Sequence, residues 1–294
     1  MMEEKRLKNI KSKKPNFFII GFPKTGTTSL YNILKQHPEI FIVDHGSYFN
    51  KDFPKHNNNR LKSDKDYLEL FSKVKDEKAI GDSSEGYVYS KIDKKKKKKF
   101  NSDAKIIMIL REPVDWLRSA YQQSHRNLKE KRPIKKAVKS REYTEKVKYK
   151  RYIKKWIETS PKKNIKIIIF KDFKKDNLGI IREIFRFLEV DDAFIPKIEK
   201  KNPSKALRFE KLQFLLDKIG LKRRTFKKIF PEKVWKLVKE IGYKKGKIQI
   251  PEKTKKELSK KIKPEVEKTD KLLHEKGFLA KERSLVYEWG YQNV

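Results

Sequence analysis

The sequence predicts one α/β domain, built on a central, mostly parallel sheet with helices on both faces. Three observations lead to this fold class. Short apolar runs typical of buried strands alternate with amphipathic segments of helical period, and the two strongest runs are 105–110 and 165–170. The sequence contains neither an internal repeat nor a clear linker. At 294 residues, the chain is also long enough for a large α/β domain.

The first half of the chain predicts a strand, a loop and a helix, followed by further strands. Residues 16–20 form an apolar run that ends at Gly21, and 27–36 carry leucine and isoleucine at helical spacing. His37-Pro38 ends that helix, because the residue before a proline avoids helical geometry. The remaining elements expected here are a strand over 39–43, a loop over 44–59, a helix over 66–74 and a strand over 78–82.

The second half continues the alternation and then becomes helical. The strand expected over 105–110 leads directly into Arg111-Glu112, and Pro113 suits the first turn of a helix over 113–128. Further predictions are a helix over 143–159, a strand over 165–170 and an amphipathic helix over 177–188. From Lys205 onward we expect only helices, broken at Gly220, Pro231, Gly242 and Pro251. We place a basic arm at 1–15 and the domain at 16–294.

Composition limits the function only coarsely. Cysteine is absent, which excludes disulfides, thiolate metal sites and cysteine nucleophiles. No apolar run approaches the roughly 20 residues of a transmembrane helix, and no signal-peptide core precedes Asn16, so we expect a cytoplasmic protein. The net charge of +38 fits attraction to polyanions, but lysines spread along the whole chain fit a compositional bias equally. Charge therefore does not name a partner.

A glycine-containing loop between the first strand and the first helix predicts a phosphate site. The segment Gly21-Phe22-Pro23-Lys24-Thr25-Gly26-Thr27-Thr28-Ser29 lies where backbone N–H groups and the positive end of a helix face a ligand. Lys24 adds a mobile positive charge. An anion, such as a nucleotide phosphate, is the ligand expected here.

The pattern differs from that of nucleoside triphosphatases. Their G-x-x-x-x-G-K-[ST] loop has lysine directly after the second glycine, whereas this chain has Thr27 there and Lys24 before Gly26. Their magnesium site also requires an aspartate near the end of a hydrophobic strand. Here the most clearly predicted strand, over 105–110, is followed by Arg111. Both departures disfavour Mg-ATP as the ligand.

Gly21 to Thr28 resembles the phosphosulfate loop of sulfotransferases that use 3′-phosphoadenosine 5′-phosphosulfate (PAPS), written G-x-x-K-x-G-T-[TS]. The resemblance implies a sulfotransferase fold related in design to P-loop nucleotide kinases. It also implies that Lys24 contacts the phosphosulfate at its bridging oxygen and acts in catalysis. The remaining cosubstrate contacts implied at this loop are Thr25, Gly26, Thr27, Thr28 and Ser29.

A second motif carries the resemblance further. In the family, a later strand ends in arginine, and a serine follows on a proline-initiated helix; together they hold the 3′-phosphate. Here Arg111 and Ser119 match, with Pro113 between them and Trp116 where many relatives have a second arginine. Ser119 should lie roughly 9 Å along the helix axis from its start, at about 1.5 Å per residue. Ile80 to Tyr87 resembles the family's G-E-x-[ST]-P-x-Y segment, with Asp82 for Glu and Glu85 for Pro.

The acceptor must lose a proton, so a base is expected nearby. If Tyr48-Phe49 takes the place of an aromatic pair found in glycan sulfotransferases, His45 occupies the position of their glutamate. An imidazole with an ordinary pKa of about 6.5 suits this role at neutral pH. Asp44 and Asp82 are the alternatives. We expect no role in catalysis for the other histidines, of which only His125 could face the active-site cleft.

The combined hypothesis is sulfuryl transfer from PAPS to a hydroxyl or amine of a glycan or small molecule, without a metal ion. The expected partners are the nucleotide cosubstrate and an unidentified acceptor, for which an anionic glycan is one candidate. Two alternatives stay open: a P-loop nucleotide kinase, and a non-catalytic basic protein that binds nucleic acid. The second lacks a zinc pattern or a repeated aromatic platform in the sequence, so nucleic acid is the less expected partner.

Overall fold

The computed structural model describes residues 14–44, 48, 61, 63–90, 101, 103–127, 129–198, 205–207 and 243–294. Its contacts divide the chain into two compact units. The first contains residues 1–112, 148–199 and 265–292, and the second contains 113–147, 200–264 and 293–294. Each unit is described by itself.

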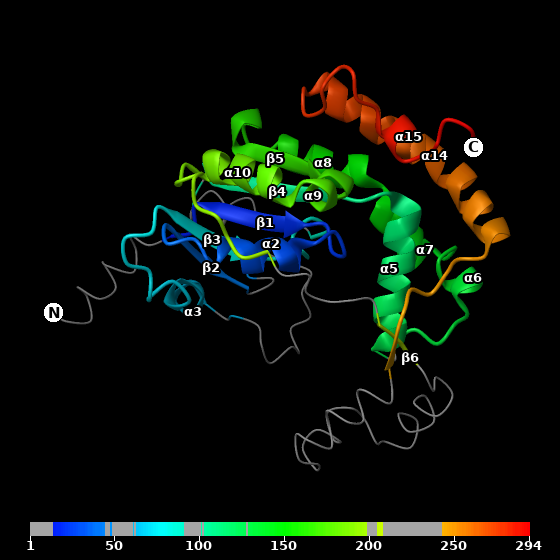
Figure 1. Ribbon diagram of the computed structural model, residues 1–294, viewed down its shortest axis with the longest axis horizontal. Helices are drawn as coiled ribbons and strands as arrows, with labels where there is room; N and C mark the ends of the chain where they lie inside the picture. The colour runs from blue at the N-terminus through cyan, green and yellow to red at the C-terminus, as the bar shows by residue number, and fades with distance from the viewer. Residues whose placement is uncertain are drawn as a thin grey trace, which may run out of the picture. The chain divides into compact units, whose positions relative to one another are not determined.

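A five-stranded sheet forms the centre of the first unit, and every neighbouring pair of its strands is parallel (Figure 1). The strand order is β2-β3-β1-β4-β5. These strands are β1 (Phe17–Gly21), β2 (Ile40–Val43), β3 (Ala79–Ser83), β4 (Lys105–Leu110) and β5 (Ile165–Ile169). Both faces of the central strands are apolar, as expected for a parallel sheet covered on both sides.

Helices flank this sheet. One face packs against α2 (Thr27–Leu34), α9 (Phe170–Lys175) and α10 (Asn177–Leu188), which share one hydrophobic core with the strands (Figure 1). Phe17 and Ile19 point into that core. Phe18 points to the opposite face, because successive strand residues alternate, and its ring meets that of Tyr87 edge to face. The predicted α/β fold class is confirmed.

The other elements of the first unit are helices that lie between and after these strands in the chain. They are α3 (Asp64–Glu69), α8 (Tyr149–Ile157), the 3-10 helix η2 (Lys162–Asn164), the second half of α14 (Glu252–Glu275) and α15 (Leu285–Glu288). No helix among the described residues is long and apolar enough to cross a membrane.

The second unit is built around α5 (Pro113–Arg126). This helix contacts α6 (Ile134–Ala137), α7 (Arg141–Thr144), the 3-10 helix η1 (Glu145–Val147) and the short strand β6 (Lys205–Leu207). Strand β6 pairs antiparallel with β7 (Tyr243–Lys245). The first half of α14 also belongs here.

Two of the predictions for secondary structure are wrong. The single helix expected over 143–159 is broken into α7, η1 and α8, with a non-helical Lys148 before α8. The break coincides with the point where the chain passes from one unit to the other, so tertiary packing overrides the local helical pattern. The expectation of helices alone beyond Lys205 is wrong as well, because β6 and β7 form a two-stranded sheet. The breaks expected at Gly220, Pro231 and Gly242, and the arm over 1–13, lie outside the described residues.

Candidate functional site

The loop after β1 has the backbone geometry of an anion cradle. Lys24 is in the left-handed region (φ 66°), and so is Gly26 (φ 94°), which caps the N-terminus of α2. Left-handed residues within such turns direct successive N–H groups to one side, where they bind anions. The first helical hydrogen bond of α2 runs from the N–H of Leu30 to the carbonyl of Gly26. Helix geometry therefore leaves the N–H groups of Thr27, Thr28 and Ser29 without an intrahelical acceptor.

Packing explains why glycine stands at position 26. A Cβ built there would lie 3.1 Å from the ring of Phe170 and 3.4 Å from that of Phe173. The backbone conformation at this position is also one that residues with a Cβ rarely adopt. The loop is further held by Thr25, whose buried hydroxyl donates to the carbonyl of Phe22 at 2.5 Å. The cradle is thus formed by local packing and hydrogen bonds within the first unit.

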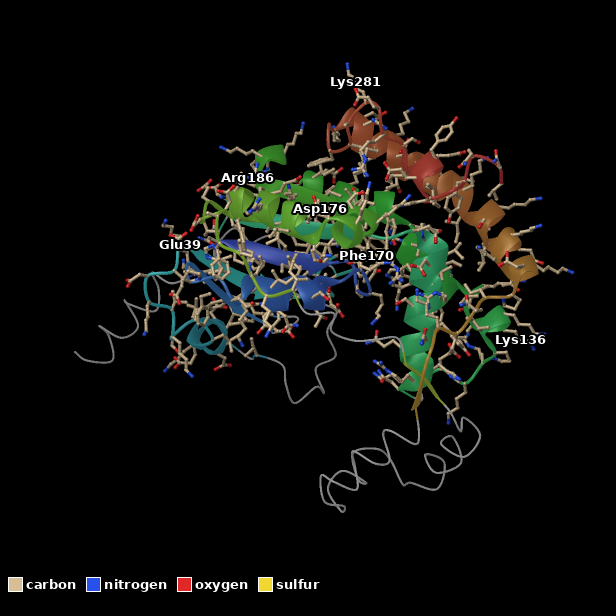
Figure 2. The ribbon with its side chains drawn as sticks, viewed as in Figure 1. Glu39, Lys136, Phe170, Asp176, Arg186 and Lys281 are labelled. Carbon is tan, nitrogen blue, oxygen red and sulfur yellow. The ribbon has the colours of Figure 1, made fainter. Side chains whose placement is uncertain are left out.

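Arg111 lies beside this loop. Its Nη1 donates to the backbone carbonyl of Lys24 at 2.6 Å, and its guanidinium lies 4.8 Å from the centre of the Phe170 ring. Phe170 begins α9 directly after β5 (Figure 2). Tyr149 of α8 donates to the carbonyl of Arg111 at 2.9 Å, which fixes the backbone at the end of β4. Arg111 itself is half-buried.

The topology makes this the expected position for a ligand. After β1 the chain crosses toward β2 and β3, and after β4 it crosses toward β5, on the other side of the sheet. Strands β1 and β4 are neighbours, so their carboxyl ends border the switch point at which ligands bind in open α/β sheets. The loop cation Lys24 and the strand-end cation Arg111 both lie at this edge. Two cations, free helix N–H groups and a glycine cradle fit a phosphorylated anion.

A buried carboxylate lies at the end of the next strand along the edge. Asp82 is completely buried and accepts hydrogen bonds from the hydroxyls of Tyr67 (2.9 Å), Tyr87 (3.0 Å) and Ser84 (2.5 Å). Burial, together with the nearby Asp82 carboxylate, raises the pKa of Tyr67 well above its ordinary value. The phenol therefore stays protonated and donates. Asp82 anchors the segment 84–87, and its three hydroxyl donors leave it poorly suited to act as a base.

The rest of the Gly81–Tyr87 segment contacts the loop. Thr27 Oγ1 donates to Glu85 Oε2 at 3.0 Å, across 58 residues of sequence. Thr27 is buried, whereas Glu85 is exposed. In the sequence, Glu85 stands out only as a departure from the G-E-x-[ST]-P-x-Y motif, and no local signal connects it with Thr27.

The sulfotransferase domain family matches residues 14–241, which is most of the chain. The chain belongs to this family. Its members are transferases, and family membership agrees with the loop and the strand-end arginine found at the switch point.

Two solved structures and one further relative are similar to this chain. The crystal structure of a sulfotransferase from Alicyclobacillus acidocaldarius matches with a TM-score of 0.71 and 23% identity, over 94% of this chain and 99% of that one. The membrane-associated sulfotransferase kil1 of Dictyostelium discoideum is 30% identical over 111 residues. That match covers 36% of this chain and 22% of kil1, so the matched region spans about a fifth of that relative. A mouse sulfotransferase solved with PAP matches with a TM-score of 0.36, over 64% of each chain.

The structure brings some of the predicted site residues together. Lys24, Thr25, Gly26, Thr27, Thr28 and Ser29 form the loop and the first turn of α2, and Arg111 touches that loop. Ser119 is half-buried on α5, in the second unit. His45 lies outside the described residues, and Asp44 is exposed after β2.

Two other side chains, those of Arg118 and His37, bind groups outside the phosphate loop. Arg118 is buried and bonded to Asp115 (2.7 Å) and Gln122 (3.2 Å) on its own helix. His37 contacts the carbonyl of Asp191 through Nε2 at 2.8 Å and accepts from the N–H of Glu39 through Nδ1 at 3.0 Å. The ring of His37 thus links Glu39 with Asp191.

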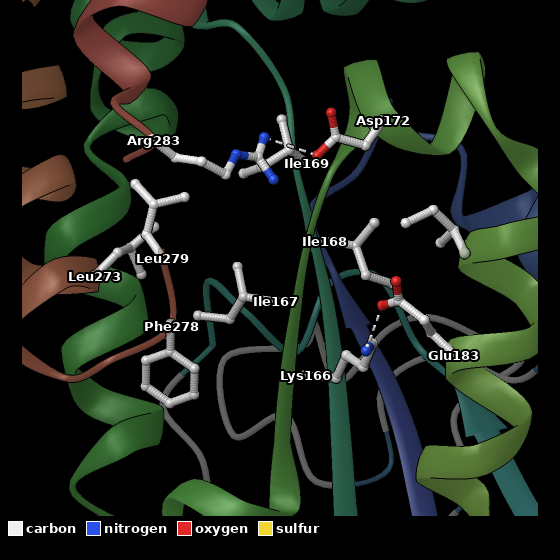
Figure 3. Close-up of a pocket in the computed structure, with 11 residues that line it drawn as sticks. Lys166, Ile167, Ile168, Ile169, Asp172, Glu183, Leu273, Phe278, Leu279 and Arg283 are labelled. Carbon is white, nitrogen blue, oxygen red and sulfur yellow. Dashed lines mark hydrogen bonds and ion pairs between the residues drawn. The ribbon is translucent and has the colours of Figure 1, made fainter. Parts of the chain in front are cut away.

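A different pocket, of about 240 Å³, runs along β5 (Figure 3). Four charged side chains line it, and they form two ion pairs: Lys166 with Glu183 and Arg283 with Asp172, both at 2.8 Å. The rest of the lining comes from β5, Ile180, Leu273, Phe278 and Leu279. It includes no residue of the phosphate loop. Because each lining cation already faces a carboxylate, we do not assign the nucleotide to this pocket. Among the described residues, no group of three or more His, Asp or Glu side chains could hold a metal ion.

Proposed function

We propose that this sulfotransferase transfers a sulfuryl group from PAPS to a hydroxyl or amine of an acceptor, either a glycan or a small molecule. The hydrogen bond between Arg111 and the backbone of Lys24 is the observation that carries the proposal, because it joins the two sequence motifs at one edge of the sheet. Two cationic side chains from these two motifs suit a ligand with phosphate groups at both its 3′ and 5′ ends. A nucleotide kinase would have an acidic magnesium ligand near the end of such a strand.

The loop residues have distinct roles in this proposal. PAPS, when bound, supplies the activated sulfuryl group on a phosphate leaving group. The N–H groups at the start of α2 and the ammonium of Lys24 stabilise the charge that grows on the leaving oxygen as the sulfur bond breaks. Held in place before the reaction, these donors need no reorganisation, so most of the catalysis comes from positioning and electrostatics.

Arg111 and Ser119 are proposed to hold the 3′-phosphate. The guanidinium of Arg111 is planar and presents a fork of donors that matches phosphate oxygens. Its contacts with Phe170 and with the Lys24 carbonyl fix the plane of that fork. His45 remains the proposed base for the acceptor proton, with Asp44 as the alternative.

Binding measurements separate this function from its rivals. We expect PAPS and its product 3′-phosphoadenosine 5′-phosphate (PAP) to bind more tightly than ATP, and a duplex oligonucleotide to bind weakly. Nucleic-acid binding falls steeply as salt increases, whereas a nucleotide enclosed by the loop should lose less affinity. Tighter binding of Mg-ATP than of PAP would support a kinase instead. Oligonucleotide binding with a steep salt dependence, and no nucleotide binding, would support the nucleic-acid alternative.

A further inference from the structure

Glu85 presents a carboxylate to the phosphate loop. Its Oε2 accepts the hydrogen bond of Thr27 Oγ1, and Thr27 is the first residue of α2. The positive end of a helix attracts anions, so this carboxylate lies close to the place where the loop would hold a phosphosulfate.

The backbone holds Glu85 in this position. The N–H of Ser84 donates to the carbonyl of Ile19 at 2.9 Å, and the N–H of Val88 donates to that of Ile20 at 3.0 Å. The carbonyl of Glu85 lies so close to the loop that a Cβ built on Gly21 would be 2.9 Å from it. The segment around Glu85 is therefore tied to β1 on both sides, which holds its backbone next to the phosphate loop.

The contact limits what Thr27 offers to a ligand. A threonine hydroxyl has one hydrogen to donate, so Thr27 can donate either to Glu85 or to a phosphate oxygen, and not to both. A bound phosphosulfate would also bring negative charge near the carboxylate, and like charges this close repel each other. Because Glu85 is exposed, solvent and salt would reduce this repulsion without removing it.

We propose that Glu85 competes with the bound anion for the hydroxyl of Thr27 and so weakens the hold of the loop on its anion, which promotes release of the product nucleotide. The identity of that nucleotide rests on the function proposed above. The competition between Glu85 and the anion at Thr27 does not, because any phosphate placed in the loop meets the same carboxylate.

The variant Glu85→Gln tests this idea, because it removes the charge and keeps an oxygen that can accept from Thr27. We expect it to bind PAP about 10-fold more tightly than wild type at low salt, a change of about 1.4 kcal/mol, which is well below the full interaction of two charges near a protein surface. The gain should shrink as salt increases, because the side chain is exposed. In a Thr27→Val background, the gain from Glu85→Gln should be smaller, since the contested hydroxyl is gone. Glu69→Gln, which removes an exposed charge on α3, is the matched control and should leave the affinity unchanged.

Isothermal titration with PAP and with inorganic pyrophosphate separates this inference from the nucleotide assignment. Pyrophosphate reports on the loop alone, so tighter pyrophosphate binding by Glu85→Gln supports the competition even if PAP proves not to be the ligand. Unchanged or weaker binding of both anions, in a variant with unchanged melting temperature, overturns it. A large loss of turnover with unchanged affinities would also overturn it, and would point to a role for Glu85 toward the acceptor.

Discussion

Arg111 Nη1 lies 2.6 Å from the carbonyl oxygen of Lys24, so a side chain at the end of β4 supports the backbone of the loop that follows β1. The two residues are 87 positions apart in the chain. The contact makes Arg111 both a proposed ligand for the 3′-phosphate and a support for the loop that would hold the 5′-phosphosulfate. A substitution of either residue is therefore expected to affect both the binding of the 3′-phosphate and the conformation of the loop.

Replacing Lys24 with alanine should reduce turnover on the order of 10²-fold or more, by comparison with the loss of one oxyanion donor. The fold should be retained, because the ammonium belongs to a half-buried loop residue and not to the core. Turnover with PAPS and the melting temperature are the two measurements.

Lys35→Ala is the control for this variant. Lys35 is exposed at the C-terminal end of α2, at the opposite end from the phosphate loop. It should keep wild-type turnover. Near-normal turnover in Lys24→Ala would remove that residue from the proposed mechanism.

Arg111→Ala should weaken the binding of PAP by a few kcal/mol, since a charged phosphate loses its partner. Adenosine 5′-phosphosulfate, which lacks the 3′-phosphate, should lose less. Some loss is expected for it too, because the support for the Lys24 backbone disappears. The measured quantity is the ratio of the two dissociation constants, compared between variant and wild type.

Arg186→Ala serves as the matched control, because this arginine is on α10 and pairs with Asp192 at 2.9 Å (Figure 2). It should change neither affinity. Equal losses for both nucleotides in Arg111→Ala would contradict its assignment to the 3′-phosphate.

Asp82→Asn should destabilise the first unit by about 1–3 kcal/mol, the usual cost of leaving a buried hydrogen-bonding group unsatisfied. An amide presents N–H donors to hydroxyls that now donate to the carboxylate, so at least one of the contacts with Tyr67, Tyr87 and Ser84 must be reversed or lost. Urea unfolding would measure the change, with the exposed Asp76→Asn as control. A variant as stable as wild type, but inactive, would return Asp82 to the list of candidate bases.

The ion pair between Arg283 and Glu288 should make stability depend on pH. Both guanidinium contacts with the carboxylate are 2.7 Å, and the hydrogen bonding from Arg283 lowers the pKa of Glu288 below its usual value. A carboxyl with a lower pKa in the folded state stabilises the fold above its unfolded pKa of about 4.3. That stabilisation is lost as the pH falls through the folded pKa.

Glu288→Gln should therefore lower the free energy of unfolding at pH 7 by up to about 1 kcal/mol, since the pair is partly exposed. The difference from wild type should vanish in strong acid. Urea titrations at pH 7 and below pH 4 would measure it. The control is Glu267→Gln, an exposed residue of α14, which should show no such convergence. A difference that persists unchanged in acid would mean that packing, and not charge, explains the effect.

The sequence predicted the sheet of the first unit well, because parallel strands that are buried on both faces consist of consecutive apolar residues. The run that gave β4 has this form after its first residue, Lys105, and the run that gave β5 departs from it only at Lys166. It did not predict β6, β7 or the break before α8. Strands β6 and β7 have three residues each and carry no alternation, and the break at Lys148 has neither proline nor glycine to mark it.

Site residues were predictable where a motif is local and not where a contact joins distant segments. The loop around Lys24 is one continuous stretch between a strand and a helix, so its role could be inferred from neighbouring residues. The hydrogen bond from Thr27 to Glu85, and the contact of Arg111 with Phe170, depend on the strand order. That order could not be obtained from periodicity alone.

The central position of β1 has a consequence for how the protein is made. This strand is synthesised before the other strands of the sheet. Both strands that flank it, β3 and β4, begin at least 58 positions later in the chain. Until Leu110 has been synthesised, the apolar strand Phe17–Gly21 has no partner on at least one side, and unpaired apolar strands are prone to aggregate. The nascent chain must therefore carry an incompletely paired apolar strand until β4 has been synthesised. Assembly of the sheet is a late event that depends on contacts distant in sequence, which are slow to form.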